Sequence, residues 1–219
     1  MSDKAFLQTV IYPDLEHDYY WSDDFSPAFY IALAKAGFIT VGIEHQGVEL
    51  LLPQIQRHYA LLNHTELHIS KHVTKLLQKK EYTFTLNQRF NNVIEGLKHS
   101  YEDCWIHLSY EKLLYELHEG CYDDFKLLSA EISDPLNNTL IAAEIGYVSN
   151  KLYTGLTKFS LKEKAYRNYG TLQRVVLIQY LDQQGIHLSN LGHHEMQYKL
   201  DLGAIVYPRE AFFKKCGLA

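Results

Sequence analysis

The sequence predicts a fold of the α+β class, and three observations predict it. Residues 26–37 begin with Ser-Pro and end with Gly, which are the preferred N-cap, first-turn and C-terminal residues of a helix. Residues 125–133, 140–148 and 152–160 alternate apolar and polar side chains, as half-buried strands do. Residues 169–184 read as a long helix that Gly185 ends, so a three-stranded meander precedes a helix.

The first 64 residues predict a small α+β domain, and residues 65–219 predict a larger one. In the first unit, helix 26–37 leads into a hairpin whose strands, 38–43 and 48–52, flank Gln46-Gly47. The join near residue 64 contains neither proline nor glycine, so we expect the two units to pack together.

The second unit begins with helices and ends with short strands. Before the meander we expect a helix at 66–80, a strand at 82–86, a helix at 88–99 and a helix that Ser109 caps and Gly120 ends. After the long helix we expect short strands at 186–188 and 204–206 and a final helix opened by Pro208.

Composition bounds the function. The chain has 219 residues, 47% hydrophobic and 21% charged, with a formal net charge of −5, which excludes a disordered chain and a strongly basic DNA-binding protein. No stretch approaches the ~20 apolar residues of a membrane helix, and the first residues do not resemble a signal peptide. Three scattered cysteines form no disulfide framework. These features predict a soluble cytoplasmic protein without a membrane partner.

Three lysines form one stripe along the helix expected at 66–80. Lys71, Lys75 and Lys79 fall at i, i+4 and i+8, while Val73 and Leu76 lie on the other face. Such a stripe is able to follow the phosphates of a nucleic acid. The alternative interpretation is an ordinary solvated helix face.

Histidines form two groups, but neither has a metal-binding motif. His64, His68 and His72 are spaced by four residues, yet HTELH differs from HExxH and no cysteine joins the group, so we expect no metal. His193-His194-Glu195 is a candidate polar pocket wall with acid–base capacity. A surface turn is the alternative interpretation of that tripeptide.

Two further patterns concern the pocket. Tyr147 and Tyr153 lie on neighbouring predicted strands, where aromatic side chains either line an apolar pocket or belong to the core. Walker A, GxGxxG and GxSxG motifs are missing, so nucleotide hydrolysis, Rossmann redox chemistry and α/β-hydrolase chemistry lack sequence support.

From residue 67 onward the chain resembles the leucyl/phenylalanyl-tRNA–protein transferase family. Single motifs are short, and their ordered succession over about residues 67–213 makes the resemblance specific. The matching segments are LHISK (67–71), YTFTL (82–86), FNNVIEG (90–96), WI (105–106), YELHEG (115–120), SAEI (129–132), LYTGLTKFS (152–160), LGA (202–204) and PREAF (208–212).

The resemblance implies a fold and a reaction. The fold is a small N-terminal domain followed by a GNAT-like domain, the architecture of acyl-CoA N-acyltransferases, over residues 65–219. The reaction moves Leu or Phe from an aminoacyl-tRNA to the α-amino group of an acceptor protein that begins with Arg or Lys, which marks it for degradation under the N-end rule. The family uses no metal and no cofactor, and it carries tRNA-binding basic residues where Lys71, Lys75 and Lys79 stand.

The chain departs from the family at several positions. An acidic residue is usual where Asn190 stands, and a Gln where Gly192 or His193 stands. The usual Gly-Glu-Ser run of the meander is Gly155-Leu156-Thr157, so a second carboxylate is missing. A neutral Asn does not pair with a basic acceptor side chain as a carboxylate does. We therefore expect an altered acceptor specificity, unless Glu144, Glu195 or Asp201 compensates.

These positions predict a pocket beside the meander. Tyr147, Tyr153, Thr157 and Ser160 would contact the substrate from the sheet, and Asn190, His193 and Glu195 would form the catalytic wall after the next strand. The aminoacyl-tRNA and the acceptor protein's N-terminus would be the partners.

Two other functions stay open at this point. One is a non-catalytic tRNA- or protein-binding relative that has lost its site carboxylates. The other is a GNAT-type acyltransferase with another donor such as a CoA thioester, although the stretch at 160–170 has a single glycine, where that donor favours a glycine-rich loop. The sequence does not specify the donor amino acid, the acceptor's first residue or the oligomeric state.

Overall fold

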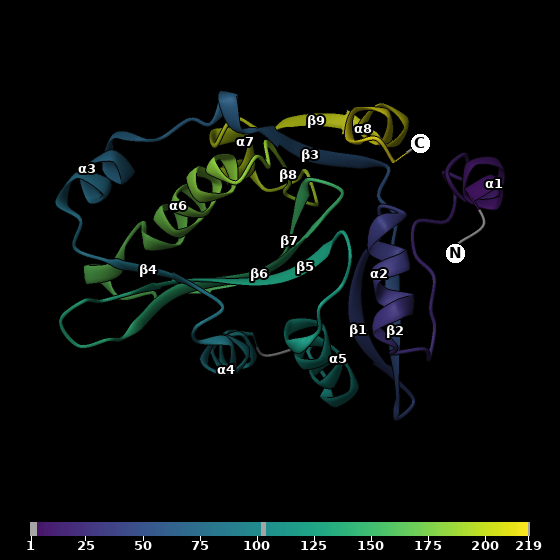
Figure 1. Cartoon of the computed structure of the whole chain (residues 1–219), viewed down its shortest axis with the longest axis horizontal. Helices are drawn as coiled ribbons and strands as arrows, with labels where there is room; N and C mark the ends of the chain where they lie inside the picture. The colour runs from purple at the N-terminus through teal and green to yellow at the C-terminus, as the bar shows by residue number, and fades with distance from the viewer. Residues whose placement is uncertain (1–3, 102–103, 219) are drawn as a thin grey trace.

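The computed structural model describes residues 4–101 and 104–218, and over these residues its centre is a mixed seven-stranded sheet (Figure 1). Residues 1–3, 102–103 and 219 of the two expected domains lie outside the described residues. The strand order is β4-β5-β6-β7-β8-β3-β9. The strands of this main sheet are β3 (His58–Asn63), β4 (Thr83–Leu86), β5 (Phe125–Ser133), β6 (Leu140–Ser149), β7 (Leu152–Ser160), β8 (Leu188–Asn190) and β9 (Ile205–Pro208).

Helices cover the sheet and alternate with its strands along the chain. A π-helical turn η1 (Leu7–Ile11) follows the short α1 (Lys4–Phe6), and 3₁₀ turns occupy η2 (His64–Glu66) and η3 (Lys164–Tyr166). The α-helices after α1 are α2 (Pro27–Lys35), α3 (Lys71–Lys79), α4 (Phe90–Ser100), α5 (Leu108–Glu119), α6 (Tyr169–Gln183), α7 (Gln197–Asp201) and α8 (Arg209–Cys216).

The predicted meander is confirmed. Strands β5, β6 and β7 pair antiparallel in sequence order, and the expected long helix follows as α6. The turns between them use Asn138 and Asn150 with φ of 59° and 49°, a backbone region that asparagine tolerates better than most residues. After α6 the chain returns as β8, which pairs parallel with β7 and gives the sheet its mixed character.

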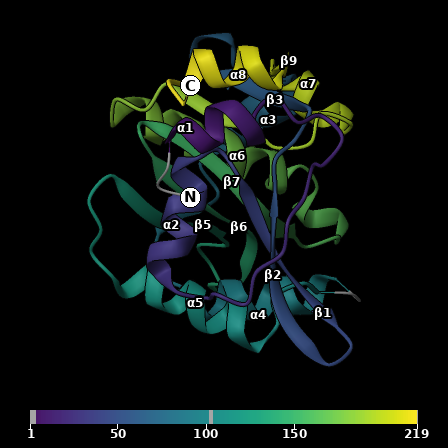
Figure 2. The ribbon, with the colours of Figure 1, turned by 90° about the vertical axis from the view of Figure 1, so that its right-hand side faces the viewer.

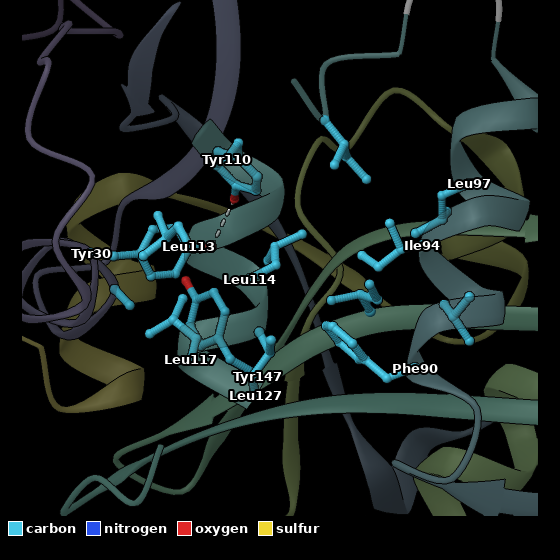
Figure 3. Packing of buried hydrophobic residues seen from close by; sticks show 14 of the residues in the cluster. Tyr30, Phe90, Ile94, Leu97, Tyr110, Leu113, Leu114, Leu117, Leu127 and Tyr147 are labelled. Carbon is cyan, nitrogen blue, oxygen red and sulfur yellow. Dashed lines mark hydrogen bonds between the residues drawn. The ribbon is translucent and has the colours of Figure 1, made fainter. Parts of the chain in front are cut away.

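The sheet is buried on both faces. Helix α6 covers one face, and α4 and α5 cover the other (Figure 1). On the α6 side, Ile132 and Ala142 of the sheet pack with Leu172 and Val175. On the opposite side, a larger core of leucines and aromatic residues joins α4 and α5 to β5 and β6 (Figure 3). Strands β5 and β6 are therefore buried over nearly their whole length and not half-buried as their alternating sequence predicted, because helices cover both faces.

The N-terminal segment contributes a separate hairpin and one strand of the main sheet. Strands β1 (Ile39–His45) and β2 (Val48–Gln54) form the predicted hairpin, which lies beside α2 (Figure 2). Strand β3 then pairs with β8 and β9, and the Tyr59 ring stacks on Phe212 of α8 at 4.0 Å. The division at residue 64 stays a prediction, and β3, which precedes it, is hydrogen-bonded into the main sheet.

Two predicted helix starts are wrong, each for a local reason. The helix expected at 66–80 begins at Lys71, because Ser70 is its N-cap and accepts a hydrogen bond from the Val73 amide. Helix α5 begins at Leu108 rather than after a Ser109 cap. The Glu49 carboxylate, from β2, accepts the amide hydrogens of Leu108 and Ser109 at 3.2 and 2.6 Å. A carboxylate far away in sequence therefore supplies the cap.

Candidate active site

A cleft of about 660 Å³ opens beside β7, where β7 and β8 separate. The two parallel strands pair only over residues 152–154 and 188–190, and among the described residues β7 continues to Ser160 without β8 as a neighbour. The cleft is lined by residues 99–101, 155–162 and 191–193 and by Ile39, Gln56, Arg174, Met196, Tyr198 and Lys199.

A β-bulge in β7 decides which side chains share a face there. Gly155 pairs with Gly146 and Thr157 with Ile145, so Leu156 has no partner in the register. One extra residue reverses the alternation of the strand from that point on. Lys158 therefore stands opposite Glu144, on the same face of the sheet.

The floor of the cleft is a buried ion pair. Arg174 Nε of α6 lies 2.7 Å from Glu144 Oε2, and the side chains are 5% and 0% exposed. The Tyr153 hydroxyl donates to Glu144 Oε1 at 2.9 Å. A Cβ atom on Gly155 would lie 2.6 Å from that same oxygen, so only glycine leaves room for the carboxylate. The carboxylate is thus fully used within the protein.

Two lysines stand above this floor. Lys158 Nζ lies 4.3 Å from the centre of the Tyr198 ring, a cation–π distance, and Lys199 Nζ donates to the His193 carbonyl at 2.6 Å. Burial and, after it, the Arg174 charge lower the pKa of each lysine to about 8, although the Glu144 charge opposes the shift. Both lysines remain mostly protonated at pH 7, so the cleft carries more positive than negative charge.

The segment after β8 is held firmly against the sheet. Asn190 is buried, and its Oδ1 accepts the Gly192 amide hydrogen at 2.9 Å. The Leu191 amide donates to the Ala60 carbonyl, and the Ala60 amide donates to the Gly192 carbonyl. Gly192 has a φ of 73°, which favours glycine at this turn. Asn190 therefore shapes the turn that carries His193 rather than lining the cleft itself.

The other two expected catalytic residues differ in position. His193 lines the cleft, and partial burial and the Lys199 charge lower the pKa of its imidazole, which favours the neutral form. Glu195 is exposed and is not among the residues that line the cleft. Of the three, His193 alone has a side chain placed to exchange a proton with a bound molecule.

The expected substrate-binding residues divide between cleft and core. Thr157 and Ser160 line the cleft. Tyr147 is buried on the opposite face of the sheet, beside Tyr30, Leu117 and Leu127 (Figure 3), where its hydroxyl donates to the Phe38 carbonyl. Tyr153 is buried under α6. A substrate role for these two tyrosines stays a prediction, and the structure gives each a packing partner inside the protein.

The lysine stripe on α3 has the expected geometry. Lys71, Lys75 and Lys79 are exposed, whereas Val73 is buried against α6. The stripe is not part of the cleft lining. Its binding of RNA stays a prediction.

The histidines that are spaced by four residues in the sequence are separated in the structure. His64 lies in the 3₁₀ turn η2, buried and 2.8 Å from Ser189 Oγ through Nε2, whereas His72 is exposed on α3. Within residues 4–101 and 104–218, no three His, Cys, Asp or Glu side chains converge as metal ligands would. Over the same part of the chain, no helix has the length and apolar character needed to cross a bilayer.

Sequence reasoning missed the charged floor and rim of the cleft. Arg174, Lys158 and Lys199 lie on α6, β7 and α7, and no spacing in the sequence relates them. A weak signal existed in Lys158, which belongs to the family-like run at 152–160. Gln56, on the opposite wall, stands in a loop between two strands and had no signal at all.

Comparison with known proteins places most of the chain in one family. The family model described as leucyl/phenylalanyl-tRNA protein transferase matches residues 61–217, which include β7, α6, β8 and α7 around the cleft.

Curated proteins named leucyl/phenylalanyl-tRNA–protein transferase are similar to the chain. The Citrobacter koseri protein is 27% identical over 161 residues, covering 72% of this chain and 63% of its own length. The Klebsiella pneumoniae protein is 28% identical over 157 residues, covering 70% and 61%. The Pseudomonas fluorescens protein is 33% identical over 113 residues, covering 50% and 47%. The chain thus spans less than two thirds of the length of these relatives.

Among solved structures, the C-terminal domain of a candidate lysylphosphatidylglycerol synthetase from Agrobacterium fabrum superposes with a TM-score of 0.49 at 14% identity. The match covers 82% of this chain and 63% of that one.

Proposed function

Because the chain belongs to the leucyl/phenylalanyl-tRNA protein transferase family, we propose that it moves a leucine- or phenylalanine-type amino acid from an aminoacyl-tRNA to the N-terminal α-amino group of an acceptor protein. The observation that carries the proposal is the cleft where β7 and β8 separate, which combines an apolar wall with the His193 imidazole. Apart from Ile39 and Gln56, the residues that line it lie within the matched residues 61–217. Ile39, Leu156, Leu191 and Met196 supply that apolar wall for the donor side chain.

The reaction is an attack of an amine on an ester. A C–N bond forms, the ester C–O bond breaks, the amine loses a proton and the ribose oxygen of the tRNA gains one. His193 is the proposed acceptor of the amine's proton, because its imidazole faces the cleft in the neutral form. Asn190 acts as a positioning residue, since its side chain fixes the turn before His193. Glu195 is exposed, so we place it at the entrance, where the acceptor chain would leave.

The tRNA would contact α3. The exposed stripe of Lys71, Lys75 and Lys79 faces away from the core and is free to approach phosphates. Thr157 and Ser160, on the wall formed by β7, are the proposed contacts for the aminoacyl end. Tyr147 and Tyr153 would support these walls from below rather than touch the substrate.

A GNAT-like assignment for residues 65–219, with a separate domain over residues 1–64, is part of the proposal. Its support is the order of elements: an antiparallel meander, a long helix and a strand parallel to β7 that separates from it. Since β3 is hydrogen-bonded to β8 and β9, we expect both parts to unfold in one transition.

The test is an in vitro transfer assay with pools of charged tRNA and model peptides that vary in their first residue. His193→Gln should lower the transfer rate by about a hundredfold or more, as the loss of a general base does. His187→Gln provides the matched control, because His187 is an exposed histidine outside the cleft. Equal rates for both variants would assign proton removal to another group.

A non-catalytic tRNA-binding relative is the second candidate. The observation that favours it is the buried Asn190, whose side chain serves the turn and leaves no carboxylate at that position for a basic acceptor. The same assay separates the two candidates, because a binding protein retains charged tRNA without forming any peptide product. An arm with acyl-CoA donors tests the remaining acyltransferase alternative.

A further inference from the structure

The cleft carries an excess of positive charge, whereas a site for basic side chains needs negative charge. Arg174, Lys158 and Lys199 line it, and the carboxylate beside them is Glu144. That carboxylate already binds Arg174 through Oε2 and accepts the Tyr153 hydroxyl through Oε1. Two lysine charges therefore stand in the cleft without a carboxylate of their own among the described residues.

Two buried polar groups at the cleft also lack partners. Arg174 Nη1 and both polar atoms of the Gln56 amide have no hydrogen-bond partner within the described residues. Arg174 is 4% exposed and Gln56 is 7% exposed. Buried donors of this kind are normally satisfied, so unpaired ones at a cleft wall are available to a bound molecule. Both residues line the cleft.

The Lys199 ammonium group and the Gln56 amide both lie near Gly192 at one end of the cleft. A Cβ atom built on Gly192 would lie 3.9 Å from Lys199 Nζ and 4.0 Å from Gln56 Nε2, with the Ile39 side chain at 3.6 Å as the third wall. A small planar anion seated there reaches an ammonium group on one side and an amide N–H on the other. Gln56 also offers its carbonyl oxygen to a neighbouring amine.

We propose that this end of the cleft binds the side-chain carboxylate of the acceptor's first residue, so that Asp- or Glu-initiated proteins are accepted in preference to Arg- or Lys-initiated ones. The inference rests on the proposed transfer function for its biological meaning, but the binding site itself is defined by the charges of the cleft. A first-residue Arg or Lys would face repulsion from Lys158, Lys199 and Arg174.

A carboxylate fits better than a phosphate of the tRNA backbone. Phosphate tracks are followed by exposed cations such as the α3 stripe, whereas Lys199 and Arg174 are 5% and 4% exposed. Groups this recessed are reached by the tip of a side chain and not by a continuous backbone. Charge-assisted hydrogen bonds formed away from water also give strong discrimination.

The experiment measures binding of matched hexapeptides to the full chain by calorimetry, with Asp, Asn, Leu or Arg as the first residue. We expect the Asp peptide to bind at least tenfold more tightly than the Asn and Arg peptides. In Lys158→Glu the Arg peptide should bind more tightly than the Asp peptide. In Lys158→Met the two peptides should bind with similar affinity. Lys126→Glu makes the same charge change at an exposed site outside the cleft lining and should keep the wild-type order.

A transfer assay with the same peptides separates this inference from the proposed function. Tighter binding of the Asp peptide without product formation from any peptide supports the carboxylate site and overturns the transferase. Product formed preferentially from the Arg peptide supports the transferase and overturns the carboxylate site. Equal binding of the Asp and Arg peptides also overturns it. The carboxylate site would also be overturned if an RNA ending in CCA displaced the Asp peptide and Lys158→Glu weakened binding of the RNA but not of the peptide.

Discussion

Lysines occupy two contrasting regions of this molecule. On α3, Lys71, Lys75 and Lys79 stand in water on one face of an amphipathic helix. In the cleft, Lys158 and Lys199 come from different elements and lie near the buried Glu144–Arg174 pair. Exposed charges act additively and are screened by salt, whereas recessed charges depend on each other and on burial. The same residue type therefore serves long-range attraction in one region and selective recognition in the other.

The largest expected effect comes from breaking the ion pair under the cleft. Glu144→Gln leaves Arg174 and two lysines without a compensating charge, so we expect the free energy of unfolding to fall by about 3–5 kcal/mol. Urea unfolding followed by circular dichroism measures it. Glu111→Gln, which removes a partly exposed carboxylate, is the matched control. A loss below 1 kcal/mol for Glu144→Gln would mean that the cleft cations are solvated like those of α3.

The pH dependence of stability tests burial at a histidine. Burial lowers the pKa of His64 to about 4, although Asp182 and its negative charge oppose the shift. As the pH falls, the unfolded chain binds a proton at His64 before the folded chain does. The contribution of His64 to the free energy of unfolding, which is present above pH 6.5, is therefore lost as the pH falls toward 4. Between pH 7 and pH 5 we expect His64 to account for about 2 kcal/mol of this loss.

The measurement for His64 compares urea unfolding of wild type and His64→Gln at pH 7 and pH 5. The variant should lose about 2 kcal/mol less than wild type over this interval. His72→Gln makes the same substitution at an exposed histidine of α3. An identical pH slope for wild type and His64→Gln would contradict the assignment of a buried neutral imidazole.

The exposed stripe should give a smaller effect that depends on salt. Changing Lys71, Lys75 and Lys79 together to Glu should weaken binding of charged tRNA by about tenfold or more. The slope of log K against log salt should drop by about 2–3, since each lost phosphate contact removes roughly 0.7–0.9. Filter binding from 50 to 200 mM salt measures both quantities. The control is a triple Glu variant at three other exposed lysines, Lys126, Lys151 and Lys214. Equal binding by both triples would leave the stripe without a specific role.

The smallest effect is expected for a surface ion pair. Lys98 Nζ lies 2.7 Å from Glu111 Oε2, with side chains 44% and 21% exposed. A double-mutant cycle of Lys98→Ala and Glu111→Ala should give a coupling energy below about 1 kcal/mol, because water and salt screen the pair. Coupling of several kcal/mol would show that exposure is a poor guide to charge energetics in this chain.

Local signals in the sequence determined much of the fold. The strands expected at 125–133 and 152–160 match β5 and β7 to the residue, and the helix expected at 169–184 differs from α6 by one residue. Ser26 caps α2 as its position before Pro27 indicates. These features succeed because alternation, caps and turn residues act between neighbours in the chain. The stripe on α3 follows for the same reason, since helical spacing alone places its lysines together.

The structure alone decided the details that make a site. Strand β3 has no alternating pattern, because its sequence HYALLN is buried on both faces and such a run does not distinguish strand from helix. The start of α5 depends on Glu49, nearly sixty residues earlier in the chain. Tyr147 pairs with Thr154, so Tyr147 and Tyr153 face opposite sides of the sheet. The bulge at Leu156 then reverses the faces of β7, which separates Thr157 from Tyr153 and places Lys158 beside Glu144.

What the sequence by itself determined about this protein is therefore its family, its meander, its main helices and its exposed basic stripe. What only the tertiary structure decided is the chemistry of the cleft: which carboxylate is already neutralised, which lysines are recessed and which side chain is free to move a proton. The physical reason is that charge and burial act through space. Glu144, Lys158, Arg174 and Lys199 meet only after a sheet, a helix and a returning segment have packed together.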